Sequence, residues 1–213
     1  MANSTKQQIK KTIQKIQGKE FIHFLHIGKT GGTAIKHVLR DYQTHYNFII
    51  YLHKHNFILR DIPKNEKFIF FVRDPVDRFI SGFYSRLRQG QPKYFSPWSD
   101  GESRAFFHFK TPNELALALY SNHANIKVKA QNAMTNIQHI RDSFWNWFED
   151  SEKFLNRAPD VFFWGSQENL NQDFELLKEK LNLPKDIGLP KDNINAHKNP
   201  TDLDKFLESK AIS

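Results

Sequence analysis

The sequence contains no cysteine among its 213 residues. Disulfide bonds, thiolate catalysis and cysteine-based zinc or iron–sulfur sites are therefore excluded. The chain also lacks any apolar run long enough for a membrane-spanning helix. Its first residues, Met-Ala-Asn-Ser-Thr-Lys, have none of the apolar character of a secretory signal, so we expect a cytoplasmic protein without a transmembrane segment.

The chain is instead basic and rich in aromatic residues. It has 31 Lys and Arg against 23 Asp and Glu, a formal net charge of +8, and 20 Phe. This charge indicates anionic partners but does not choose among nucleotides, nucleic acids, acidic sugars and membranes. The length suits one domain with a sizeable core. We expect a basic, helical leader over residues 1–19, followed by a single domain over residues 20–213.

The apolar pattern predicts strands that alternate with helices. Strands are expected over 20–27, 47–52, 67–72 and 160–164. Helices are expected over 34–41, 75–87, 111–122, 130–149 and 170–181, with a short last helix from Thr201-Asp-Leu-Asp204. Residues 89–110 are expected to form a long ordered loop over the edge of the sheet. The alternation predicts an α/β fold with a mainly parallel central sheet flanked by helices.

The first motif is the loop Gly28-Lys-Thr-Gly-Gly-Thr33, which joins a predicted strand to a helix that opens at Ala34. The first N–H groups of a helix have no intrahelical partner and attract negative charge, so this corner is a candidate phosphate or sulfate-ester site. The triphosphate motif G-x-x-x-x-G-K-[ST] is excluded, because it needs glycine where the chain has His23. A tight turn without a ligand is the alternative.

The second motif begins at Arg73, at the carboxyl end of the strongest predicted strand, where open α/β sheets place their ligands. Ser81 follows two helical turns later. An arginine fork and a hydroxyl suit a second phosphate. The alternatives are an ion pair of Arg73 with Asp74 or Asp77, and packing of Ser81 as a small residue.

Together these two motifs resemble the sulfotransferase superfamily, whose members use PAPS (3′-phosphoadenosine 5′-phosphosulfate). The residues that carry the resemblance are His26-Ile-Gly-Lys-Thr-Gly-Gly-Thr33 and Phe71-Val-Arg-Asp-Pro-Val-Asp-Arg-Phe-Ile-Ser-Gly-Phe-Tyr84. The resemblance is closest to the branch of bacterial and carbohydrate sulfotransferases and covers roughly residues 20–200. Gly28 stands where that branch commonly has proline, a departure expected to alter the stiffness of the loop more than its ligand chemistry.

The resemblance implies a P-loop-NTPase-like sulfotransferase fold and an enzyme that moves the sulfuryl group of PAPS to a hydroxyl, or an amine, of an unidentified acceptor such as a carbohydrate. Arg73 and Ser81 would hold the 3′-phosphate. Lys29 would also neutralise charge on the bridging oxygen as the sulfuryl group departs. The residues that would hold the phosphosulfate are Lys29, Thr30, Gly31, Gly32, Thr33 and Ala34.

The transfer also needs a base, and the segment between the motifs offers two histidines. Imidazole suits the task because its ordinary pKa is near neutral. We favour His55, whose spacing to Asp61 resembles the pattern of the branch, and His53 is the alternative. We expect His26 to shape the loop. No divalent metal is implied, because no Asp is placed to hold Mg²⁺ beside the loop.

Aromatic residues suggest where the acceptor binds. Lys93-Tyr-Phe-Ser-Pro-Trp98 and the Phe144–Phe148 cluster could line an acceptor pocket or fill the core, and at least one of Trp145 and Trp147 should be core. Three cations nearby could attract an acidic acceptor or form a solvated face: Arg86, Arg88 and Lys93.

Three rival functions stay open. The chain could be a small-molecule kinase-like transferase, a non-catalytic nucleotide- or nucleic-acid-binding protein, or an inactive relative. Nucleic acid is disfavoured as a partner because no predicted helix is densely basic. The inactive relative is considered because similar proteins continue with another helix after the one expected at Thr201. A small-molecule or saccharide acceptor is the expected partner.

Overall fold

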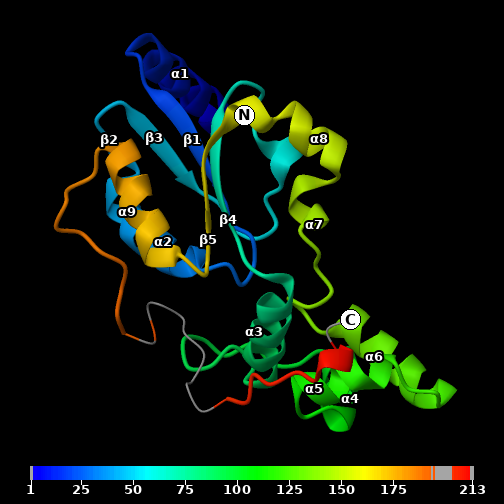
Figure 1. Cartoon of the computed structure of the whole chain (residues 1–213). Helices are drawn as coiled ribbons and strands as arrows, with labels where there is room; N and C mark the ends of the chain where they lie inside the picture. Colours follow the sequence, from blue (N-terminus) through cyan, green and yellow to red (C-terminus); the bar gives the residue numbers. More distant parts are fainter. Residues whose placement is uncertain (1, 193, 195–202, 212–213) are drawn as a thin grey trace.

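The computed structural model describes residues 2–192, 194 and 203–211, with side chains from residue 9 onward. Within these ranges the chain forms a central sheet, helices on both of its faces, and a group of helices at one end (Figure 1). The start of the short helix expected at Thr201 lies outside the described residues. The last described element is the short 3₁₀ helix η4 (Ser209–Ala211).

The sheet has five strands in the order β2-β3-β1-β4-β5. β1 (Glu20–Leu25), β3 (Phe48–Leu52), β4 (Lys67–Val72) and β5 (Val161–Ser166) run parallel, and β2 (Thr44–His45) pairs antiparallel with β3 at one edge. The prediction of an α/β fold with a mainly parallel sheet is confirmed. The short antiparallel edge strand had no signal in the apolar pattern.

The helices connect these strands and cover the sheet. Their bounds are α1 (Ala2–Ile16), α2 (Gly32–Leu39), α3 (Pro75–Leu87), α4 (Asp100–His108), α5 (Pro112–Leu119), α6 (Ala124–Asn136), α7 (Trp145–Phe148), α8 (Ser151–Asn156) and α9 (Leu170–Leu181). Three further 3₁₀ turns are η1 (Arg40–Tyr42), η2 (Leu59–Asp61) and η3 (Ala158–Asp160).

The core strands are apolar at successive positions, because both faces of the sheet are covered by other elements. Phe24 and Phe71 face α2 and α9, where they pack in one core cluster with Leu177. Phe70 points the other way and packs with Trp147 against α7 and η2. Figure 1 shows α2 and α9 on one side of the sheet and α7 and α8 on the other.

A third core lies among α3, α4, α5 and α6, at the end of the sheet where β4 passes into α3 (Figure 1). Phe83 of α3 and Phe106 of α4 lie edge to face, with ring centroids 5.3 Å apart. α3 begins as expected, with Pro75 in its first turn and Asp74 accepting hydrogen bonds from the N–H groups of Val76 and Asp77. This cap fixes the direction in which α3 leaves the sheet.

Two expectations about this helical group were wrong. Residues 89–110 are not one long loop, because α4 occupies part of them and begins with a capping box between Ser99 and Glu102. The helix expected over 130–149 is two helices, α6 and α7. The break includes His139, whose φ of 71° lies in the left-handed region and cannot continue a right-handed helix.

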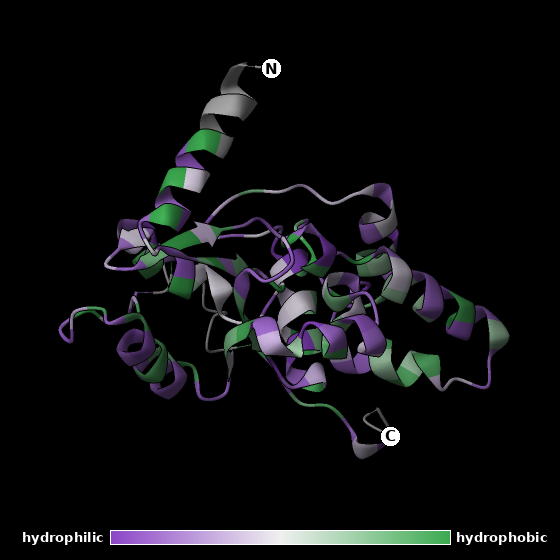
Figure 2. Ribbon diagram, turned by 90° about the horizontal axis from the view of Figure 1, so that it is seen from above, coloured by the Kyte–Doolittle hydropathy of each residue, from purple (hydrophilic) through white to green (hydrophobic). Residues whose placement is uncertain are grey.

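Helix α1 projects from the body of the protein (Figure 2), and three of its apolar side chains are exposed. Ile9, Ile13 and Ile16 are 55%, 50% and 81% exposed. Lys11 lies on the opposite side of the helix, where its ammonium is 2.7 Å from the buried Glu66 carboxylate. The helical spacing of these isoleucines therefore predicts a helix correctly but not which side of it meets the protein.

Arg86 forms a buried ion pair rather than a solvated face or an acceptor site. Its Nε and an Nη donate to the two carboxylate oxygens of Glu102 over 2.6 and 2.8 Å. Burial opposes the charge on Glu102, but hydrogen bonds from Arg86, Ser99 and Gln138 outweigh it and lower the pKa of Glu102 to about 2. The pair ties α3 to the start of α4 and to the segment after α6.

We predict that Glu102→Gln lowers the free energy of unfolding at neutral pH by about 3–5 kcal/mol, because it leaves a buried guanidinium without its carboxylate. The depressed pKa of Glu102 means that the contribution of the pair is present above about pH 4.5 and is lost as the pH falls toward 2. Urea unfolding at neutral pH and near pH 3 measures both effects. Glu179→Gln, on the exposed side of α9, is the control, and equal stability of the two variants would contradict the prediction.

Candidate functional site

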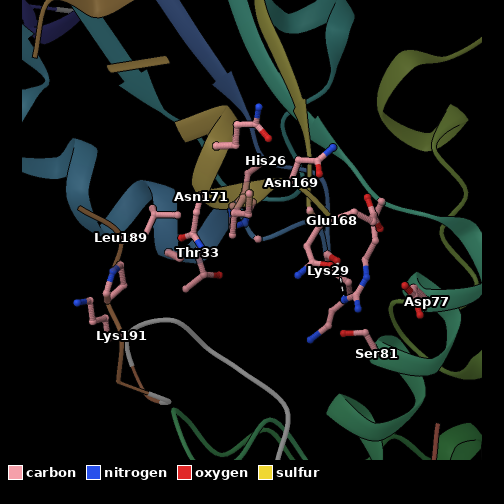
Figure 3. A pocket seen from close by; sticks show the side chains of 18 of the residues that line it. His26, Lys29, Thr33, Asp77, Ser81, Glu168, Asn169, Asn171, Leu189 and Lys191 are labelled. Carbon is pink, nitrogen blue, oxygen red and sulfur yellow. Dashed lines mark hydrogen bonds between the residues drawn. The ribbon is translucent and has the colours of Figure 1, made fainter. Parts of the chain in front are cut away.

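A cavity of about 910 Å³ opens at the carboxyl end of the sheet. Its walls come from the loop after β1, from α3, and from the corner between β5 and α9 (Figure 3). The expected site residues that line it are Lys29, Gly31, Gly32, Thr33, Ala34, His55, Arg73 and Ser81. Thr30 and the alternative base His53 are not among its lining residues.

The loop after β1 presents main-chain groups to the cavity. Lys29 and Gly31 both have positive φ, 69° and 82°, so the chain turns sharply before α2 begins at Gly32. Gly31 supplies no side-chain cap, which leaves the first N–H groups of α2 available to an anion. The Thr30 hydroxyl instead donates to the carbonyl of Ile27 over 3.0 Å, so this buried side chain holds the turn.

The glycine at position 32 makes room for a histidine. A Cβ built there would lie 2.4 Å from Cδ2 of His26, which is too close for any real contact. His26 lines the cavity, and its ring lies against that of His55, with centroids 3.9 Å apart and planes tilted by 33°. The expectation that His26 shapes the loop stays a prediction, and Gly32 is the residue that its ring constrains.

Positive charge is concentrated around Lys29. Burial and, to a smaller extent, the nearby cations Arg88, Arg73 and Arg78 together lower the pKa of Lys29 to about 7. Arg73 donates from an Nη to the carbonyl of Lys29 over 3.4 Å, the hydrogen bond drawn in Figure 3. A bound anion would stabilise all of these charges, so the electrostatics at this end of the cavity favour an anionic ligand.

Arg73 itself has unused donor capacity. Its Nε is buried and has no hydrogen-bond partner among the described residues. No ion pair joins it to Asp74 or Asp77 within the described part of the chain, although both carboxylates favour its charged form. Ser81, in α3, is also buried and lines the same cavity. The two residues expected to share a phosphate therefore lie on one wall.

Arg78 supports the loop from outside the cavity. Its Nε donates to the carbonyl of Gly28 over 3.0 Å, and an Nη donates to the carbonyl of Asp142 over 2.6 Å. The guanidinium carbon lies 5.0 Å from the ring centroid of Phe144 and 5.5 Å from that of Trp147. Arg78 thus joins α3, the β1 loop and the segment before α7.

The two candidate bases lie in different surroundings. Nδ1 of His55 is 3.0 Å from the carbonyl of His26, so this nitrogen carries the proton and donates it to the hydrogen bond, which leaves Nε2 as an acceptor. Desolvation by the surrounding residues lowers the pKa of His55 even though the residue as a whole is exposed, so the ring is neutral at neutral pH. A neutral imidazole with a free Nε2 beside an anion site can accept a proton.

His53 lies in a buried network instead. Its Nε2 is 2.8 Å from Nδ1 of His23, whose own Nε2 is 2.9 Å from the Glu66 carboxylate. The ring stacks on Phe57 at a centroid distance of 3.4 Å, and burial lowers the pKa of His53 to about 4. His23 is thus a sheet residue, as its position in β1 predicts. Its hydrogen bond to His53 engages Nε2 of His53, which does not line the cavity.

The aromatic residues divide between core and cavity. Trp147 is buried and Trp145 is 49% exposed, as expected for two positions on different sides of a helix. Trp98 packs against Phe106 and donates from Nε1 to the carbonyl of Arg86 over 2.6 Å, so it belongs to the core. Tyr94 alone of the segment 93–98 is among the residues that line the cavity.

Several lining residues had no individual signal in the sequence. These are His139, between α6 and α7, the segment 167–172 at the corner of β5 and α9, and the segment 188–191 after α9. The apolar pattern pointed only to the helix expected over 170–181, whose start lies in this wall. The remaining residues reach the cavity through tertiary packing, which a single sequence does not reveal.

None of the helices in the described part of the chain has the length and apolar character of a membrane span. Likewise, the described histidines and carboxylates form no group of three or more that could hold a metal ion.

Comparison with protein-family models gives one match: the model of the sulfotransferase family covers residues 14–210. The matched range includes all the residues expected to line the site. No curated protein and no solved structure matches the chain.

We predict that Lys29→Met stabilises the unliganded protein, because a buried ammonium among arginines costs free energy. Below about pH 7 both folded and unfolded chains carry this proton, and the variant should be more stable by about 1–3 kcal/mol. As the pH rises from 7 toward 10.5 the folded protein releases the proton first, so the advantage should shrink.

Urea unfolding across this pH range is the measurement. Lys64→Met, at an exposed position, is the matched control and should show no such advantage. A Lys29→Met protein that is less stable than the parent at every pH would contradict the prediction.

Proposed function

The chain belongs to the sulfotransferase family, as its two motifs predicted, and we propose that it transfers the sulfuryl group of PAPS to a hydroxyl or amine of a small-molecule or saccharide acceptor. The observation that carries this proposal is the convergence of the motifs on one cavity. Lys29, His55, Arg73 and Ser81 are far apart in the sequence, yet all four line it. Each has the chemistry that one part of this transfer needs.

The site fits a donor that is anionic at two ends. The N–H groups at the start of α2 and the ammonium of Lys29 suit the phosphosulfate. The unused Nε of Arg73 and the hydroxyl of Ser81 suit a second phosphate on the same molecule. A 3′-phosphate distinguishes PAPS from ATP and ADP, so Arg73 and Ser81 would select the donor.

In the proposed reaction the acceptor oxygen attacks sulfur in line with the bond that breaks. Nε2 of His55 takes the proton of the acceptor as the new S–O bond forms. The electron pair of the breaking S–O bond passes to the phosphate oxygen of the departing nucleotide, where Lys29 neutralises the charge. Positioning and electrostatic stabilisation supply most of the acceleration, and the base adds about 10²–10⁴-fold.

The low pKa of Lys29 in the free protein is consistent with this role. A phosphosulfate beside it would favour the ammonium form, so binding of the donor would draw a proton onto Lys29. The same charge that destabilises the empty site therefore strengthens donor binding. No proton needs to leave Lys29 during the transfer.

We predict that the protein binds 3′-phosphoadenosine 5′-phosphate, the product nucleotide, more tightly than ADP. Arg73→Ala should weaken binding of this nucleotide about tenfold or more and change ADP binding little, because ADP lacks the 3′-phosphate. Isothermal titration calorimetry with both nucleotides is the measurement, and Arg104→Ala, exposed on α4, is the control. Tighter binding of ADP would favour a kinase-like transferase instead.

We predict that His55→Ala lowers transfer by about 10²–10⁴-fold while nucleotide binding persists, because the variant lacks only the base. His53→Ala should retain most of the activity and lose some stability through its network with His23. Radiolabelled PAPS with a panel of alcohols, phenols, amines and saccharides gives the readout. An active His55→Ala protein together with an inactive His53→Ala protein would move the base to His53.

A further inference from the structure

His139 lines the cavity but has no role in the transfer of the sulfuryl group as proposed above. It lies between α6 and α7 and lines the cavity together with Lys29, His55 and Ser81. Its ring centroid is 6.1 Å from that of His55, with the two planes at 63°. Neither ring nitrogen forms a hydrogen bond with another residue in the described part of the chain.

Two glycines from separate elements make room for this residue. A Cβ at Gly28, in the loop after β1, would lie 3.3 Å from Nδ1 of His139. A Cβ at Gly82, inside α3, would lie 3.2 Å from the carbonyl oxygen of His139. Both distances are tighter than ordinary contacts, so a larger side chain at either position would displace His139.

The backbone at His139 is also held in an unfavourable conformation. Its φ of 71° is in the left-handed region, which costs free energy for a residue with a Cβ. Glycine inside α3 is a second cost, because it weakens a helix relative to alanine. Both features allow the imidazole of His139 to lie against the cavity.

The surroundings of His139 keep its ring uncharged. Burial, together with the nearby cations Lys29, Arg86 and Arg78, lowers its pKa to about 3. A neutral imidazole has one N–H donor and one acceptor nitrogen. At neutral pH His139 is therefore uncharged and can donate one hydrogen bond without exchanging a proton in the reaction.

We propose that His139 is a second imidazole of the transfer centre, whose N–H donates a hydrogen bond to a non-bridging oxygen of the sulfuryl group. This inference rests on the proposed function. It follows from position, because His139 lies beside Lys29 and His55, the two groups that flank sulfur in the proposed reaction. His55 takes the acceptor proton, Lys29 faces the departing oxygen, and His139 orients the group that moves between them.

The proposal predicts a difference between two nucleotides that share every other contact. PAPS carries the sulfuryl group, and 3′-phosphoadenosine 5′-phosphate does not. His139→Gly removes the ring and suits the left-handed backbone, so it should fold at least as well as the parent. It should lose about tenfold in affinity for PAPS and little for 3′-phosphoadenosine 5′-phosphate, as expected for a hydrogen bond to a charged group.

His139→Asn is the conservative variant, because asparagine tolerates positive φ and retains an N–H donor. It should recover part of the PAPS affinity that His139→Gly loses. His37→Leu, at an exposed position on α2, is the control. Isothermal titration calorimetry without acceptor, with each of the two nucleotides and each of the four proteins, gives eight affinities, and thermal unfolding verifies that each variant folds.

The possible results separate the two proposals. If the parent protein binds neither nucleotide, the proposed function fails, and this inference fails with it. If the parent binds both, but His139→Gly weakens them equally or leaves both unchanged, the proposed function stands and His139 does not contact the sulfuryl group. A selective loss of PAPS affinity in His139→Gly, partly restored in His139→Asn, supports the contact.

Discussion

The guanidinium of Arg78 holds together the parts of the molecule that form the cavity. It extends from α3, donates to the carbonyl of Gly28 in the loop after β1, and donates to the carbonyl of Asp142 before α7. The rings of Phe144 and Trp147 lie over it. The loop that carries Lys29, the helix that carries Ser81 and the segment that carries His139 are therefore set relative to one another by one buried side chain. Such hydrogen bonds to a charged donor are stronger than those between neutral groups.

The cations Lys29 and Arg73 of the site have no carboxylate of the described chain paired with them. The pKa of Lys29 is lowered by its surroundings, and the buried Nε of Arg73 has no hydrogen-bond partner among the described residues. Elsewhere the same fold pairs its buried cations closely, as Arg86 does with Glu102. The contrast is physical support for a ligand at Lys29, because native proteins satisfy buried polar groups unless function requires otherwise.

The sequence predicted the elements whose signals are local. The continuous apolar run of β4 and the Asp74-Pro75 start of α3 were both interpreted correctly, because strand burial and helix capping depend on neighbouring residues. α4 was missed although Ser99 and Glu102 form a capping box, since the glycines and prolines nearby dominated the interpretation. His139 was beyond prediction: its place in the cavity depends on Gly28 and Gly82, which are distant in the chain. The expectation that Gly28 affects loop stiffness lacked this steric reason.

The order in which the chain supplies the walls of the cavity has a consequence for its synthesis. The loop after β1 and the start of α3 are made early, but the wall that faces them includes Gln167 and extends to Lys191. A ligand that needs both walls cannot bind a nascent chain that ends before this region. A ligand that contacts both walls can therefore stabilise the protein only after the chain has passed β5, and until then the positive charge around Lys29 has no ligand to neutralise it.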